Sequence, residues 1–141
     1  MDGPALFLSF ANMNSIVQNF LKHLGERNLS ALVDLFAENV DWFIPGNEAL
    51  APWLGRRSTR AVVQDFFELL WENTEPVSAS IDHMFIDNEH AVITGEFSTR
   101  MLKTGKVVDS LFFIQMTVLE NKIVRYRLLE DSYAVSESLQ D

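Results

Sequence analysis

The chain contains no cysteine, and this absence excludes several kinds of chemistry. It can form no disulfide, carries no thiolate nucleophile and offers no zinc site built on sulfur. Its three histidines, His23, His83 and His90, fall in different predicted elements, with no spacing that presents two of them to one ion. The sequence also lacks a glycine-rich phosphate loop and a nucleophile elbow. We therefore expect no metal site.

Positive charge is scarce as well. Eleven Lys and Arg stand against twenty Asp and Glu, which gives a formal net charge of -9 at pH 7. A protein of this charge repels nucleic acid and anionic lipid, so we expect no nucleic-acid partner and no membrane partner.

The N-terminal segment carries no recognisable targeting signal. The apolar stretch ALFLSFA at residues 5–11 is short and follows Asp2 rather than a basic segment, so it does not resemble a signal peptide. We expect a cytoplasmic protein. Met13 precedes the first clear helical pattern and is a candidate alternative start. Residues 1–12 are therefore interpreted as a loosely attached extension, and residues 13–141 as one domain.

Aromatic residues are abundant by contrast. The chain has 48% hydrophobic residues, with eleven Phe and three Trp among its 141 residues. This content is ample for a sizeable core. The surplus has two interpretations, an aromatic-lined ligand cavity or a large core together with a dimer interface, and composition does not choose between them.

Three helices are predicted in the first half of the chain. The first starts at Asn14 and ends near Gly25, and its apolar residues repeat with helical spacing: Ile16, Val17, Phe20, Leu21 and Leu24. The second is capped by Asn28 and carries Leu29, Leu32, Val33 and Phe36 on one face. The third follows a cap at Ser58 or Thr59, with Val62, Val63, Phe66, Phe67 and Leu70 on its apolar face.

Strands account for most of the remaining chain. VDWFIPG predicts one strand, broken by Pro45, in which Trp42 and Ile44 point inward if Asp41 points outward. After Pro76 four further strands are predicted, at about 77–86, 91–101, 107–119 and 122–130. Short turns between long strands require antiparallel pairing. The predicted class is thus α+β, a curved antiparallel sheet wrapped around the three N-terminal-half helices.

This order of elements, with its local sequences, resembles the nuclear-transport-factor-2-like superfamily, in its SnoaL-like and ketosteroid-isomerase-related branches. The segments that carry the resemblance are FLKHLGERNLSALVDLFAENVDWFIPG, PWLGRRSTRAVVQDFF, KTGKVVDS and NKIVRYRLLEDS, within residues 14–139. The resemblance implies a cone of curved sheet closed by helices around a deep pocket, commonly in a homodimer. It does not fix the function, because this fold serves several reactions and also proteins without catalysis.

The known active sites of the superfamily match this chain poorly. Where the ketosteroid isomerase has its base, its tyrosine and its oxyanion aspartate, this chain has Ile44, Phe20 and either Phe113 or Ile114. Hydrocarbon side chains can neither take a proton nor donate a hydrogen bond. The arginine and first aspartate of limonene epoxide hydrolase would fall around Phe112 and Ile114, so that constellation is also missing.

One catalytic residue of the family is retained. RLLED, from Arg127 to Asp131, resembles the strand ending in which the aspartate of SnoaL-like proteins and of the hydrolase is the acid/base group. By this resemblance Asp131 is the catalytic candidate. The alternative is that Asp131 caps a short helix over YAVSES, and both roles stay open. Arg127 is expected either to hold a carbonyl or anionic group of a ligand or to be a surface charge.

Four aromatic residues complete the predicted site. Trp42, Phe113 and Tyr126 are expected to line the pocket, and Trp53, between Pro52 and Gly55, to form its lid or a dimer contact. For Trp42 plain core is an equal alternative. The sequence thus predicts a homodimer that binds a small apolar or carbonyl-containing ligand. It is either an isomerase, cyclase or hydrolase that needs no cofactor, or a binding or interaction module without catalysis.

Overall fold

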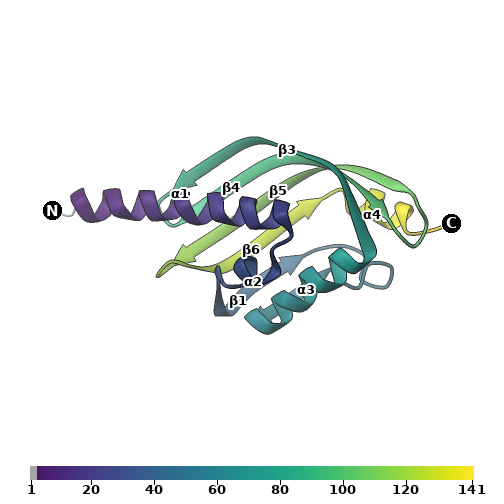
Figure 1. Cartoon of the computed structure of the whole chain (residues 1–141), viewed down its shortest axis with the longest axis horizontal. Coiled ribbons are helices and arrows are strands. Elements are labelled where there is room, and N and C mark those ends of the chain that lie inside the picture. The colour runs from purple at the N-terminus through teal and green to yellow at the C-terminus, as the bar shows by residue number, and fades with distance from the viewer. Residues whose placement is uncertain (1–2) are drawn as a thin grey trace.

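The computed structural model describes residues 3–141 of the chain, and it describes side chains from residue 12 onward. Its centre is one six-stranded sheet in the order β2-β1-β6-β5-β4-β3, and helices α1, α2 and α3 lie on one side of it (Figure 1). The pair β1–β6 is parallel and every other neighbouring pair is antiparallel. The elements run in the order α1 (Gly3–Glu26), α2 (Leu29–Val33), β1 (Phe36–Ile44), β2 (Gly55–Thr59), α3 (Arg60–Asn73), β3 (Thr74–Asp87), β4 (His90–Met101), β5 (Val107–Leu119), β6 (Lys122–Glu130) and α4 (Ser132–Ser138).

Helix α1 begins well before the predicted start at Asn14. It starts at Gly3 and continues without a break to Glu26. Pro4 lies in the first turn, where a proline is tolerated, and no further proline or glycine interrupts the chain until Gly25. Met13 is buried. The boundary between residues 1–12 and 13–141 stays a prediction, because residues 1–2 and the side chains up to residue 11 lie outside the described part.

Helix α2 is shorter than predicted, and β1 is longer. Asn28 caps the helix as expected, its Oδ1 accepting a hydrogen bond from the amide of Ala31 at 3.3 Å. The helix ends at Val33, so the assignment of Phe36 to its apolar face was wrong. Phe36 is the first residue of β1, where it is fully buried. Its burial was predictable from its apolar character, whereas its element was not.

Strand β2 was missed by the sequence pattern. Its residues, GRRST, show no apolar alternation, and they form an edge strand only by pairing with β1, Phe43 with Arg56 and Ile44 with Gly55. Directly after it, Thr59 caps α3 through a hydrogen bond that Oγ1 accepts from the amide of Val62 at 3.4 Å. Of the two caps considered, Thr59 is therefore the one used.

The four-stranded meander is confirmed. Strands β4, β5 and β6 match the predicted ranges closely, while β3 begins at Thr74 rather than near residue 77. The earlier start includes Pro76, which an edge strand accommodates because its missing amide faces no neighbour. The turns use residues at positive φ, Asn88 after β3, Gly105 after β4 and the pair Glu120–Asn121 after β5.

An aromatic cluster fills the space between the helices and the sheet. Its buried members come from α1, β1, α3 and β6, and their rings form tilted, edge-to-face and stacked pairs: Phe20, Phe36, Trp42, Phe66, Phe67 and Tyr126. Trp42 and Ile44 both point inward, as the alternation along β1 predicted. Much of the aromatic content is thus core.

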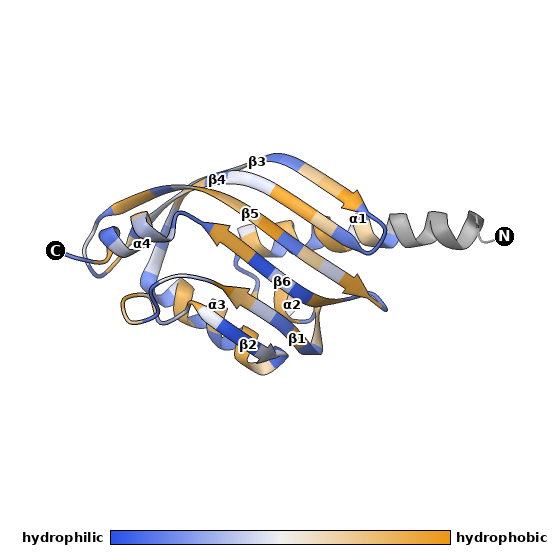
Figure 2. Ribbon diagram, turned by 180° about the vertical axis from the view of Figure 1, so that it is seen from behind, coloured by the Kyte–Doolittle hydropathy of each residue, from blue (hydrophilic) through white to orange (hydrophobic). Residues whose placement is uncertain are grey.

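The sheet has a second face that helices α1, α2 and α3 do not cover. Seen from behind, strands β3 to β6 lie in front and α1 lies beyond them (Figure 2). We call this face the outer face and the helix side the inner face. Among the described residues, no helix is long and apolar enough to cross a membrane.

Candidate functional site

Strand β6 presents different residues to the two faces of the sheet. Tyr126 and Leu128 point to the inner face, where they pack in or against the core, and Glu130 follows them by alternation. Arg125, Arg127 and Leu129 point to the outer face, opposite Thr117, Gln115 and Phe113 of β5. This division is the one that strand alternation predicted. It separates residues that the sequence had assigned to one pocket.

The four predicted aromatic residues do not meet in one place. Trp42 and Tyr126 stack on each other inside the core, with ring centroids 4.2 Å apart and an angle of 14° between the planes. Trp53 is also buried, with 4% of its surface exposed. Phe113 lies on the opposite side of the sheet, 53% exposed on the outer face. The structure therefore places Phe113 away from Trp42 and Tyr126.

Arg127 is engaged by an aspartate on the neighbouring strand. Its guanidinium donates to Asp41 twice, from Nη2 to Oδ1 at 2.9 Å and from Nη1 to the backbone carbonyl at 2.8 Å. Arg125 donates to Oδ2 of the same carboxylate at 2.8 Å. The hydrogen bond from Arg127, with the charges of both arginines, holds the pKa of Asp41 below its ordinary value. The parallel pairing of β1 with β6, which the sequence did not reveal, creates this cluster.

Asp131 acts as the N-cap of helix α4. Its Oδ1 accepts a hydrogen bond from the amide of Ala134 at 3.0 Å, and its own amide donates to Oγ of Ser110 at 2.9 Å. The residue is exposed at the end of the strand. Asp131 therefore has the helix-capping role that the sequence offered as the alternative, while its acid/base role stays a prediction.

Glu130 is the carboxyl group that the fold desolvates. It is the register partner of Phe112 on β5, whose side chain is buried on the inner face. Burial, with a smaller contribution from the charge of Asp131, raises the pKa of Glu130 to about 7. Glu130 nevertheless keeps part of its accessible surface. Sequence reasoning missed it because the family pattern pointed to the next residue, although the alternation along β6 had separated the two acids.

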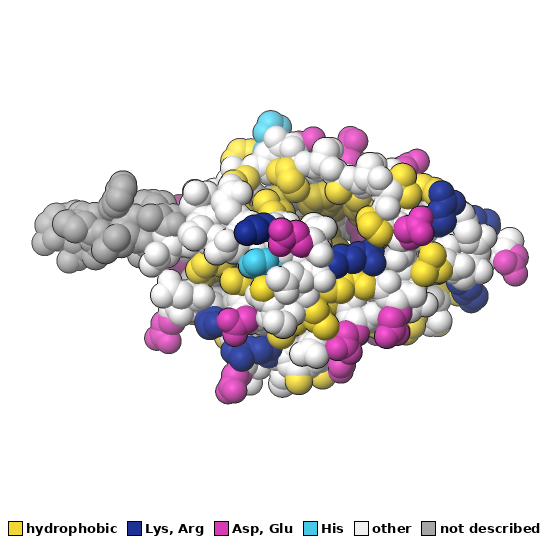
Figure 3. Space-filling view, in the orientation of Figure 1, with side chains coloured by type: hydrophobic (Ala, Val, Ile, Leu, Met, Phe, Trp, Pro, Cys, Tyr) yellow, Lys and Arg dark blue, Asp and Glu magenta, His cyan; other side chains and the backbone are white. Residues whose placement is uncertain are grey.

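Part of the inner face is open to solvent beside the helices. Figure 3 shows hydrophobic side chains recessed on this side, below the rim that β3 forms. Ile81 of β3 contributes an apolar side chain that is 45% exposed, and its register partner is Gly95 of β4. Gly95 in turn pairs with Phe112, and Phe112 with Glu130. One row of register partners on the inner face thus connects Ile81, at the edge of the sheet, with Glu130.

A shallow trough of about 720 Å³ crosses strands β3 to β6 on the outer face. On β3 and β4 its lining consists of one inward-pointing residue and the two outward-pointing residues beside it, as with Phe97 between Glu96 and Ser98, and β5 and the end of β6 add a similar run together with Phe113. This pattern is expected of a hollow on the outer face, which contacts the side chains of the two outward-pointing residues and the backbone of the inward-pointing residue between them. Phe113, Glu130 and Asp131 all line this trough, Glu130 as the inward-pointing residue between Leu129 and Asp131. Phe113 and Asp131 thus share the outer surface, whereas Trp42 and Tyr126 lie on the inner face.

Two questions about the site follow from these residues: whether they could bind a metal ion, and which of them could transfer a proton. In the part of the chain whose side chains are described, no three His, Asp or Glu gather as metal ligands. Tyr126 keeps its proton, because burial raises the pKa of its hydroxyl further above the ordinary value and the charge of Glu130 adds to this effect. The inner face therefore offers one titratable carboxyl among apolar and aromatic side chains.

Comparison with known proteins agrees with this architecture. A family model described as a SnoaL-like domain matches residues 17–126. A protein of Burkholderia xenovorans described as NTF2-like is 20% identical, with a TM-score of 0.82 over 92% of this chain and 97% of that chain. A candidate isomerase of Rhodopseudomonas palustris is 15% identical, with a TM-score of 0.77 over 90% of this chain and 94% of that chain.

A candidate SnoaL-like polyketide cyclase of Mesorhizobium loti is also 15% identical, with a TM-score of 0.68 over 82% of this chain and 96% of that chain. At these identities the structural matches establish the fold alone. None of the curated proteins matches the sequence.

Proposed function

Because this chain belongs to the family of SnoaL-like domains, we propose that it binds a small, mostly apolar carbonyl compound on its inner face and moves a proton on it, with Glu130 as the acid/base group. The observation that carries this proposal is the position of Glu130. Its carboxyl is partly accessible and lies on the inner face at the C-terminal end of β6, where Glu130 pairs with the buried Phe112. No cofactor is needed for this reaction.

The environment of Glu130 suits proton transfer at neutral pH. Burial raises the pKa of its carboxyl to about 7, so protonated and ionised forms coexist there. The carboxylate would remove a proton from the carbon next to a carbonyl, and the resulting carboxylic acid would return it to another carbon of the same molecule. The proton and the electrons balance within the substrate, so the net reaction is an isomerisation.

The side chains around this route are apolar, which sets the class of ligand. Ile81 and Phe97 are partly exposed along the inner face, and Phe112 borders Glu130. Ile44 and Phe20, which by the resemblance correspond to the ketosteroid isomerase's base and tyrosine, are fully buried hydrocarbons. A proton-transfer reaction in this fold would therefore use Glu130 instead of those positions.

The test is hydrogen–deuterium exchange on carbonyl compounds. Small apolar ketones and esters are incubated with the protein in D₂O, and loss of the proton next to the carbonyl is followed by ¹H NMR. For a compound that exchanges, Glu130→Gln should lower the rate by roughly a hundredfold to ten-thousandfold. Asp131→Asn is the matched control, because it changes the adjacent acid in the same way and should keep the rate.

The outcomes separate the candidates. Loss of exchange in Asp131→Asn, with Glu130→Gln unaffected, would transfer the acid/base role to Asp131 and overturn the proposal for Glu130. Compounds that bind without any exchange would also overturn it, and would favour a binding module of the same fold without catalysis.

We also propose that two copies of the chain pair through their outer faces. Along β6 and directly after it, the outward residues follow the order Arg125, Arg127, Leu129 and Asp131, so charge passes from positive through apolar to negative. Leu129 lies opposite Phe113, and the two are 55% and 53% exposed. A two-fold axis near this apolar centre would set the acidic end of one copy against the arginines of the other.

A further inference from the structure

Gly95, in the middle of β4, leaves a place on the inner face that an aromatic ring from the next strand fills. A Cβ at residue 95 would stand 2.8 Å from Cζ and 2.9 Å from Cε1 of Phe112. These distances are shorter than a normal van der Waals contact, so the tip of the ring takes up the space of the missing side chain. The ring of Phe97, also on β4, lies beside it, with the two centroids 6.2 Å apart. Phe112 thus extends its ring from β5 over β4.

The direction of this ring decides what lies over Glu130. Phe112 is the register partner of Gly95 on one side and of Glu130 on the other, so the three positions form one row of the inner face. Side chains directly opposite each other on antiparallel strands have Cβ atoms only about 5 Å apart, so a ring at residue 112 can cover either neighbour but not both. Because strands lie about 4.8 Å apart, a ring tip above β4 is roughly 10 Å from the backbone of β6. The Phe112 ring therefore leaves the carboxyl of Glu130 uncovered.

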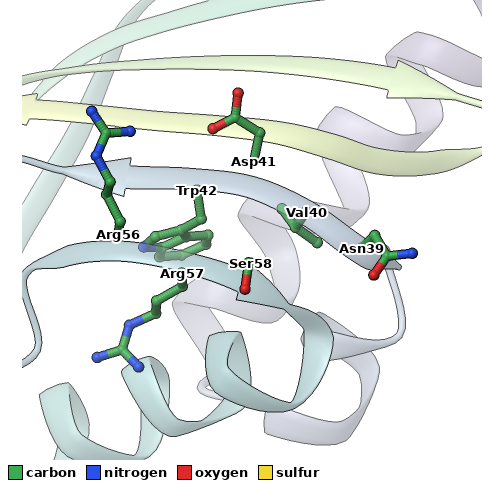
Figure 4. Close-up of a pocket in the computed structure, with 7 residues that line it drawn as sticks. All are labelled: Asn39, Val40, Asp41, Trp42, Arg56, Arg57 and Ser58. Atoms are coloured by element: carbon green, nitrogen blue, oxygen red, sulfur yellow. The ribbon is translucent and has the colours of Figure 1, made fainter.

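The contact between Gly95 and Phe112 belongs to the inner face alone. Neither residue lines the trough on the outer face or the hollow of about 490 Å³ where the register of β1 and β2 shifts. Figure 4 shows that the lining of this hollow comes from β1 and β2. Glu130, the neighbour of Phe112 in the row, keeps part of its accessible surface. The effect of the glycine is therefore to be sought at Glu130.

We propose that Gly95 is a specificity-determining residue for the reaction assigned to Glu130: it keeps the Phe112 ring over β4 and so leaves room beside the carboxyl for a bulky group on the reacting carbon of the ligand. The inference rests on the function proposed above. A side chain at residue 95 would displace the ring, and the space toward β6 is its other neighbouring position in the row. The displaced ring would narrow the approach to Glu130 and exclude branched or cyclic ligands before small ones.

A purely structural reason for this glycine also exists. The carbonyl oxygen of Ser80 on β3 approaches the position of the missing Cβ, next to the register shift between Ile81 and His83. Glycine inside a strand often marks such a close approach of another backbone. Gly95→Ala can therefore damage the fold without any effect on specificity. The test needs a measurement that such damage alone would not move, and a second variant.

The first measurement is the pKa of Glu130, followed by ¹³C NMR of its side-chain carboxyl and assigned with Glu130→Gln. Phe112→Leu removes the ring without touching Gly95, and it should leave the pKa near the wild-type value of about 7, because the ring does not cover the carboxyl. In Gly95→Ala the displaced ring takes water away from the carboxyl, so the pKa should rise above that value. Gly25→Ala is the matched control, since a Cβ there meets no atom within 4 Å outside its own stretch of helix, and it should leave the pKa unchanged.

The titration can contradict the proposal in two ways. A fall of the Glu130 pKa toward its ordinary value of 4.5 in Phe112→Leu would show that the ring covers the carboxyl, and would overturn the proposal. A folded Gly95→Ala protein with an unchanged pKa would overturn it as well. If Gly95→Ala does not fold, Phe112→Leu alone decides.

The second measurement compares two ketones of different bulk in the deuterium-exchange assay. Gly95→Ala should slow the exchange of cyclohexanone at least about tenfold more than that of acetone, because only the larger ketone needs the space. Equal slowing of both would indicate damage to the fold and refute the specificity role. Absence of exchange in the wild-type protein for every ketone would instead overturn the function proposed for Glu130, and the specificity role with it, whatever the titration shows.

Discussion

Trp42 of β1 and Tyr126 of β6 stack nearly parallel where these two neighbouring strands run in the same direction. Their rings join the N-terminal strand pair to the C-terminal meander from the inner side. The helix that packs on them supplies Phe20, whose ring centroid lies 5.7 Å from that of Tyr126. This contact makes Phe20 the most direct probe of how the two halves of the sheet are held together.

Phe20→Ala should lower the free energy of unfolding by about 3 to 5 kcal/mol, because it removes a fully buried ring and leaves a cavity among aromatic neighbours. Chemical denaturation followed by circular dichroism measures the change. Phe85→Ala, on an exposed ring, is the control and should change stability little. A similar midpoint for Phe20→Ala and the wild type would contradict the packing described for α1.

The cap at α4 gives a second prediction. Asp131→Ala should cost about 1 kcal/mol of stability, because the amide of Ala134 loses its acceptor. Asp131→Asn should stay within a few tenths of a kcal/mol of the wild type, since asparagine caps about as well as aspartate. Equal losses in both variants, measured by urea denaturation, would show that the charge rather than the cap matters.

Glu130 predicts a particular dependence of stability on pH. Its pKa is raised from 4.5 to about 7 in the folded state, so the folded state holds the proton more tightly than the unfolded chain. The stabilisation by this proton is complete below about pH 4.5, declines as the pH rises and is gone above about pH 7, with a total of roughly 3 kcal/mol.

Glu130→Gln removes this titration and should flatten the decline of the urea midpoint between about pH 5 and pH 7, the range that lies between the unfolded and folded pKa values of Glu130. Asp131→Asn should keep most of the slope. An unchanged slope in Glu130→Gln would mean that Glu130 ionises normally and is not desolvated.

The proposed pairing of outer faces predicts a dimer in solution. Light scattering at micromolar concentration should give twice the mass of the chain, and Phe113→Glu should give a monomer, because it buries a charge at the apolar centre. Tyr133→Glu is the control, on a side chain that is 74% exposed on α4. A monomeric wild-type protein would contradict the pairing, and so would a Phe113→Glu variant that remains dimeric.

Much of the fold could be predicted from local chemistry. Asn28, Thr59 and Asp131 were all recognised as possible caps, because a short polar side chain ahead of an apolar helical pattern has few other roles. The meander was predictable from its turns. The start of α1 and the strand assignment of Phe36 were not, since a short apolar run is compatible with either element.

The site was harder to predict, because it depends on pairing between distant strands. Nothing in GRRST indicates a strand until β1 lies beside it, and the contact of Arg127 with Asp41 exists only through the parallel junction of β1 and β6. Alternation separated Glu130 from Asp131 correctly. It could not say which of the two faces the core, and that question decides which acid is desolvated.

The strand order has a consequence for how the chain folds. Strand β6 is the last to be synthesised, yet it lies between β1 and β5 and makes the only strand pairing between β1–β2 and the meander of the described sheet. Until residue 130 is available, both β1 and β5 present an open edge to other chains. Closure of the sheet is then a late, long-range step, so chains that end before β6 should aggregate rather than fold partially.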